Sequence, residues 1–140
     1  MMLRVIIASF IASAFAHNIL DFGAIEDDTS LTTDQANSDA LHKALQAANS
    51  TDNEDRTIMI PAGKTFSSLP ICAENLANVD FVIDGTLLAS KHHLHYPSRN
   101  NHDHGDTDDI DDGMLKEREY TIRQFIELHN VENITFSGKG

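Results

Sequence analysis

The 140-residue chain has no tryptophan, three prolines and a single cysteine. With Cys72 alone, it has no internal disulfide framework. Cys72 is either a buried apolar side chain or the partner of a cysteine further along a longer chain. Because aromatic residues make up only 6% of the sequence, aliphatic side chains must supply most of a hydrophobic core.

Basic residues are also scarce, with 10 Lys and Arg against 22 Asp and Glu and a formal net charge of −12. This balance excludes a nucleic-acid backbone as a partner, because that partner requires clustered Lys and Arg. It would also repel a polyanionic ligand at long range, unless the binding cleft were locally basic. The length allows one domain at most.

Long hydrophobic runs are missing as well. The apolar run Val5–Phe15 follows Arg4 and is shorter than the roughly 18 residues that a membrane span needs. Ala14-Phe15-Ala16 is a small-x-small cleavage site, so residues 1–16 are expected to be a signal peptide, with a buried N-terminal helix as the alternative. We therefore expect a secreted, extracellular protein whose single domain, residues 17–140, has no membrane association after cleavage.

Residues 18–24 alternate apolar and polar side chains and end in a glycine, which predicts a short strand and a turn. Thr32 and Gln35 offer a capping box for a helix over about residues 33–48. One apolar stripe at helical spacing contains Leu41, Ala44, Leu45 and Ala48. His42 lies outside this stripe and is expected to be a solvated helix residue and not a metal ligand.

From Thr57 the apolar pattern changes to a period of two. Ile58 and Ile60 share one face, and residues 61–63 (Pro-Ala-Gly) end the strand. Further short strands are predicted near residues 65–67, 69–73, 81–83, 87–89, 120–128 and 134–136.

There is also an internal echo, in which Asn78 and Asn130 each begin an Asn-Val-acid sequence that precedes a strand and a glycine. Short strands and such an echo are typical of stacked coils, with the turn asparagines stacked along one edge. A β-sandwich competes with this arrangement. However, its hairpins favour Asn-Gly or Asp-Gly turns, and only Asp84-Gly85 and Asp112-Gly113 offer one.

Five segments carry a family resemblance, in the order and spacing of the N-terminal region of polygalacturonase-like glycoside hydrolases (family 28, pectin-lyase-like β-helix superfamily). They are residues 21–24 (Asp-Phe-Gly-Ala), 37–45, 58–63 (Ile-Met-Ile-Pro-Ala-Gly), 81–89 and 125–140. The resemblance implies an all-β fold, namely the first coils of a right-handed parallel β-helix with an N-terminal capping α-helix. The chain stops on the second glycine of a Gly-x-Gly-x-Ile-Asp-Gly motif, so we expect it to be truncated.

The resemblance implies that the whole protein is a secreted, inverting glycosidase that acts on a pectin-like polysaccharide, as a monomer and without a cofactor. In that family the active site is built from later Asn-Thr-Asp, Asp-Asp, Gly-His-Gly and Arg-Ile-Lys segments. The acidic pairs here and the step His104-Gly105 lie in loops, in the wrong order; the pairs are Asp27-Asp28, Asp108-Asp109 and Asp111-Asp112. We therefore assign no catalytic residue and no metal ligand. The alternatives are a non-catalytic secreted glycan-binding β-helix module and an inactive fragment.

Residues 91–118 form a His- and Asp-rich stretch, expected to be a flexible loop between coils. Its histidines are His92, His93, His95, His102 and His104. It can be a solvated insertion, a divalent metal site, or a flap that gains charge at mildly acidic pH. It is a poor calcium loop, because setting Gly113 at the sixth position places Ile110 where the third oxygen ligand belongs.

Two N-glycosylation sequons are present, at Asn49-Ser50-Thr51 and Asn133-Ile134-Thr135. Asn49 is a candidate acceptor in a polar loop. Asn133 lies in a predicted coil turn, where it is equally a candidate sugar acceptor and a candidate ladder residue.

Overall fold

The computed structural model describes residues 16–50, 55–96 and 124–140. The expected signal peptide up to residue 15, the sequon residue Thr51 and residues 97–123 lie outside this part. The predictions for His102, His104 and the acidic pairs after residue 105 therefore concern residues that the structure does not describe.

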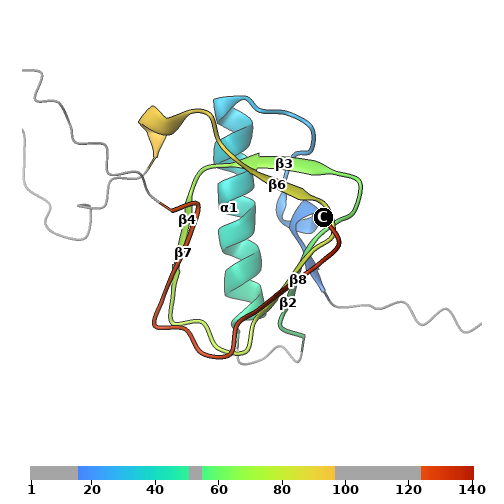
Figure 1. Cartoon of the computed structure of the whole chain (residues 1–140), viewed down its shortest axis with the longest axis vertical. Coiled ribbons are helices and arrows are strands. Elements are labelled where there is room, and N and C mark those ends of the chain that lie inside the picture. The colour runs from blue at the N-terminus through green and yellow to red at the C-terminus, as the bar shows by residue number, and fades with distance from the viewer. Residues whose placement is uncertain (1–15, 51–54, 97–123) are drawn as a thin grey trace, which may run out of the picture.

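The described chain contains one α-helix, two 3-10 segments and eight short strands (Figure 1). In order, the elements are β1 (His17–Asn18), η1 (Ile19–Phe22), α1 (Leu31–Ala48), β2 (Thr57–Ile60), β3 (Thr65–Ser68), β4 (Ile71–Glu74), β5 (Asp80–Ile83), β6 (Thr86–Ala89), η2 (His93–His95), β7 (Ile126–His129) and β8 (Thr135–Ser137). The strands form three sheets, with the orders β1-β2-β5-β8, β3-β6 and β4-β7, and every pairing is parallel. The prediction of parallel strands with one helix is confirmed.

From β2 onward, consecutive strands belong to different sheets. The strands β2, β3 and β4 make a first circuit through the three sheets, β5, β6 and β7 make a second circuit in the same order, and β8 returns to the first sheet. Figure 1 shows the three sheets as the sides of a ring, with α1 crossing it. Each strand therefore lies directly against its counterpart in the next circuit.

Side chains that point into the ring repeat from one circuit to the next. Ile58 pairs in register with Phe81, and Phe81 pairs with Phe136. The two phenyl rings stack with their centroids 4.6 Å apart. The predicted shared face of Ile58 and Ile60 is confirmed, since both are buried.

The helix α1 packs against β1, η1 and all three strands of the first circuit. Its predicted apolar stripe is confirmed, because all four side chains are buried in the main core. The predicted N-terminus was wrong by two residues: Ser30 is the N-cap, and its Oγ accepts from the Thr33 backbone N–H at 3.3 Å. Ser30 acts as the cap because its extended backbone turns its hydroxyl toward the first helical turn.

Two other predictions need correction. Residues 18–24 contain the predicted turn, but the predicted strand is shorter than expected: only Asn18 of this range is in a strand, because Ile19–Phe22 forms a 3-10 turn that Gly23 closes with a left-handed φ of 94°. His42 is half-buried and not solvated: its Nδ1 lies 2.8 Å from the Ser38 carbonyl and its Nε2 lies 3.2 Å from the Cys72 carbonyl. The strand β4 approaches the side of α1 that carries His42, a tertiary contact that helical periodicity does not reveal. No helix within the described ranges is long and apolar enough to cross a membrane.

Candidate functional site

The two sequon asparagines belong to one stacked corner of the ring. The corner between β4 and β5 contains Asn75 and Asn78, and the corner between β7 and β8 contains Asn130 and Asn133. All four have left-handed backbones with φ between 49° and 57°. The Nδ2 of Asn133 donates to Oδ1 of Asn78 at 2.8 Å, and Asn130 donates to Asn75 in the same way. The prediction of turn asparagines stacked along one edge is confirmed.

The register between β5 and β8 shows that the internal repeat was aligned incorrectly from the sequence. Asp80 pairs with Thr135, so each residue of the second circuit matches the residue 55 positions later in this sheet. The echo placed Asn78 on Asn130, whereas the structure places it on Asn133. The sequence similarity was misleading because both corners carry two asparagines three residues apart. The shared Asn-Val-acid sequence aligns Asn78 with the first asparagine of the second corner, whereas in the structure it stacks on the second.

The other sequon residue, Asn49, covers the free edge of the first corner. Its Nδ2 donates to the Asn75 carbonyl at 3.1 Å, and its Oδ1 accepts from the Ala77 backbone N–H at 3.0 Å. The side-chain amide thus takes the place of a peptide group from a preceding circuit.

Other segments also cover the outer backbone edge of the first circuit, which has no preceding circuit to pair with. The strand β1 pairs with β2, the buried Asn37 donates to the Ser67 carbonyl on β3, and the His42 ring meets the Cys72 carbonyl on β4. Asn37 also exchanges two hydrogen bonds with the backbone of Ile25. These backbone groups, which would otherwise be open to pairing with another strand, are therefore satisfied at this end of the ring.

The acidic pair Asp27-Asp28 supports the chain around the helix N-terminus. Asp28 accepts from the Thr33 hydroxyl at 2.6 Å and from the Ser30 hydroxyl and backbone N–H at 3.0 Å each. The Thr33 hydroxyl is the main cause that lowers the pKa of the Asp28 carboxyl below its ordinary value of 3.8, and the two bonds from Ser30 lower it further. The Asp27 side chain accepts from the Thr65 backbone N–H. Both carboxylates have structural partners.

A serine, a histidine and an aspartate also meet beside the start of α1. The Ser90 hydroxyl donates to Oδ2 of the fully buried Asp34, and His92 Nε2 lies 3.9 Å from the same oxygen. His92 Nε2 is closer to the Thr29 carbonyl, at 3.2 Å. Because the serine donates to the carboxylate and not to the imidazole, the group lacks the nucleophile–base contact of a hydrolytic triad. Its contacts join the residues that follow β6 to the helix.

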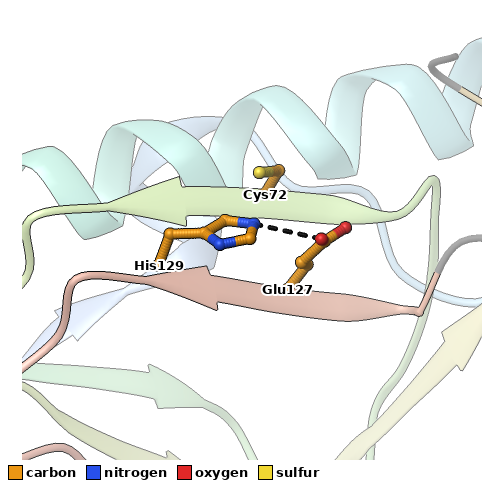
Figure 2. Close-up of side chains that lie close together, drawn as sticks. All are labelled: Cys72, Glu127 and His129. Carbon is orange, nitrogen blue, oxygen red and sulfur yellow. Dashed lines mark hydrogen bonds and ion pairs between the residues drawn. The ribbon is translucent and has the colours of Figure 1, made fainter. Parts of the chain in front are cut away.

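The outer face of the β4–β7 sheet brings together a thiol, a carboxylate and an imidazole (Figure 2). Cys72 on β4 is the register partner of Glu127 on β7, and His129 is two residues further along β7. Their ligand atoms all lie within 4.8 Å of one another, and His129 Nε2 is 3.0 Å from Glu127 Oε1. Within the described residues, this is the one group of three or more His, Cys and acidic side chains so arranged.

Sequence reasoning missed this group. The available signal was the alternation Glu127-x-His129 on a strand, which places both side chains on one face. Cys72 could be added only with the register between β4 and β7. His93 and His95, which the sequence singled out, are exposed on η2 and lie outside the group.

Comparisons with known proteins were negative at every level: no family model, no curated protein and no solved structure matches this chain.

Proposed function

We propose that this chain forms the first coils of a right-handed parallel β-helix, closed at one end by α1, in a secreted protein that hydrolyses a pectin-like polysaccharide. The observation that carries the proposal is the stacking of the second corner on the first, with Asn78 bonded to Asn133. A solenoid repeats such contacts between neighbouring circuits. The sequence resemblance to polygalacturonase-like hydrolases supplies the substrate class.

On this proposal the described residues act as the closed end of the scaffold. The side chains of Asn37, His42 and Asn49 form hydrogen bonds with backbone groups of the first circuit, and β1 pairs with the free edge of β2. A closed end prevents edge-to-edge association of an otherwise open sheet. Since Asp27 and Asp28 are both engaged in structural hydrogen bonds, the carboxylates for hydrolysis belong to other coils.

These 140 residues carry a net charge of −12, which opposes the approach of a polyanionic substrate to this end of the protein. Long-range repulsion between the protein and polygalacturonate weakens as salt shortens the screening length to about 8 Å at physiological ionic strength. We therefore expect the apparent affinity for polygalacturonate to rise from low salt to physiological salt. The affinity for fully methyl-esterified pectin, which is uncharged, should not change.

The test uses the protein secreted by cells that express the natural gene. It is incubated at mildly acidic pH with polygalacturonate, with methyl-esterified pectin and with dextran as the control polymer. We expect new reducing ends from a pectic polymer, formed with inversion at the anomeric carbon, and none from dextran. If neither pectic polymer releases reducing ends, the proposed hydrolase activity is wrong. Retention on an immobilised pectic polymer without cleavage would establish the glycan-binding alternative instead.

A further inference from the structure

The group formed by Cys72, Glu127 and His129 is built by the regular part of the fold. Along β4 and β7, Ile71 and Leu128 point into the ring and pack in or against the core. Because strand side chains alternate, Cys72, Glu127 and His129 point outward. Two paired strands with fixed register hold all three side chains, so the group does not depend on a loop.

The spacing of the ligand atoms is close to what one tetrahedral ion requires. With metal–nitrogen and metal–oxygen bonds of about 2.0–2.1 Å, two such ligands on one zinc ion lie roughly 3.3 Å apart. His129 Nε2 and Glu127 Oε1 are 3.0 Å apart. The Cys72 sulfur lies within 4.8 Å of both. On a tetrahedral ion with a metal–sulfur bond of about 2.3 Å, the sulfur would lie roughly 3.6 Å from each of them, so a movement of about 1 Å completes the site.

The donor set selects the class of ion. Thiolate and imidazole are soft or borderline ligands that suit zinc and related transition metals, whereas calcium and magnesium prefer all-oxygen sites. The side chain of Glu127 is 13% exposed and that of His129 is 50% exposed, so an ion can reach the group from solvent. Three protein ligands leave the fourth position of a tetrahedral ion for water or an external ligand.

We propose that Cys72, Glu127 and His129 form a binding site for a divalent transition-metal ion of the zinc class, which connects the first circuit of the ring to the second. The Cys72 thiol binds as the thiolate and releases its proton to solvent. The ion joins residues 55 positions apart in the sequence, so it restricts a long loop in the unfolded chain and stabilises the folded one. This site is independent of the proposed action on polysaccharide.

The test adds zinc to the untagged, chelator-treated chain under reducing conditions and measures binding by calorimetry. Cobalt is the spectroscopic probe, because a cobalt–thiolate bond gives a charge-transfer absorption that histidine and carboxylate ligands lack. We expect one zinc per chain and the thiolate absorption with cobalt. Cys72→Ser should abolish the absorption, and His129→Gln should weaken zinc binding by at least tenfold.

The matched control replaces four of the five histidines of residues 91–118 together, as His93→Gln, His95→Gln, His102→Gln and His104→Gln. It keeps His92, whose Nε2 contacts the Thr29 carbonyl. It should keep both the zinc stoichiometry and the cobalt–thiolate absorption. Alkylation of Cys72, followed by mass spectrometry, reports on the site in every variant that keeps the thiol, and zinc should slow it. Zinc binding that persists in Cys72→Ser and disappears in the four-histidine variant would overturn the proposal. An unchanged alkylation rate at saturating zinc would overturn it as well.

Discussion

The side-chain amide of Asn133 donates to that of Asn78 across 2.8 Å, although the two residues are 55 positions apart in the sequence. Asn130 and Asn75 repeat the contact one turn earlier. Left-handed backbones at all four positions aim these amides along the stack. Asparagine tolerates that conformation better than other residues with a side chain, which explains why it recurs at both corners.

Asn49 extends the same ladder of asparagine side chains by one step. Substitutions in its sequon separate its role as a structural cap from its role as a candidate sugar acceptor. Asn49→Ala leaves the Asn75 carbonyl and the Ala77 N–H without their partner, and should lower the free energy of unfolding by about 1–2 kcal/mol. Thr51→Ala removes the sequon but keeps the Asn49 amide. Urea denaturation of both variants, made without glycosylation, should show a loss only for Asn49→Ala; equal stability of the two would contradict the capping role.

Gly85 is required by close backbone contact. A Cβ at this position would lie 2.2 Å from the Pro61 carbonyl oxygen and 2.7 Å from that of Lys64. Gly85→Ala must therefore displace the backbone, at a cost of about 1–3 kcal/mol. The control is Gly63→Asn: Gly63 has a φ of 73° with open space around it, and asparagine tolerates that conformation. If urea midpoints fall less for Gly85→Ala than for Gly63→Asn, the close contact is not what limits position 85.

Asn37 joins the helix to two other segments through buried hydrogen bonds. Asn37→Ala deprives the Ser67 carbonyl and the Ile25 backbone of their partners, so we expect a loss of about 2–3 kcal/mol. Gln35→Ala, at an exposed position of the same helix, should change stability by less than about 0.5 kcal/mol. Thermal unfolding of the two variants checks this, and comparable losses would show that Asn37 is not a specific link.

Asp28 should make the start of α1 sensitive to acid. Its carboxyl pKa is lowered in the folded chain, chiefly by the Thr33 hydroxyl, so its contribution is complete above the ordinary pKa of 3.8 and is lost as the pH falls through the lower folded value. Asp28→Asn should remove this part of the acid dependence. An NMR titration of the Thr33 amide should show a transition below pH 3.8 that is absent in Asp28→Asn. A transition at or above 3.8 would contradict the lowered pKa.

Much of the local structure could be predicted from the sequence. The strands around Ile58, Phe66 and Phe81 and the apolar stripe of the helix follow from periodicity, which reflects which face is buried. Local patterns could not give the register between circuits, because that depends on contacts 55 positions apart. The same limit hid the group of Cys72, Glu127 and His129. It also hid the role of His42, whose partner is a backbone carbonyl on β4.

The register between β5 and β8 tests the stacked circuits most directly. In a Cys72→Ser background, cysteines at Val82 and Ser137, which are register partners, are treated with a short thiol crosslinker. The comparison pair is Val82 with Thr135, which shares the same outward face two residues away. We predict an intramolecular crosslink for Val82→Cys with Ser137→Cys, and much less for Val82→Cys with Thr135→Cys. Equal crosslinking of both pairs, or a preference for the second, would contradict the stacking on which the proposed β-helix rests.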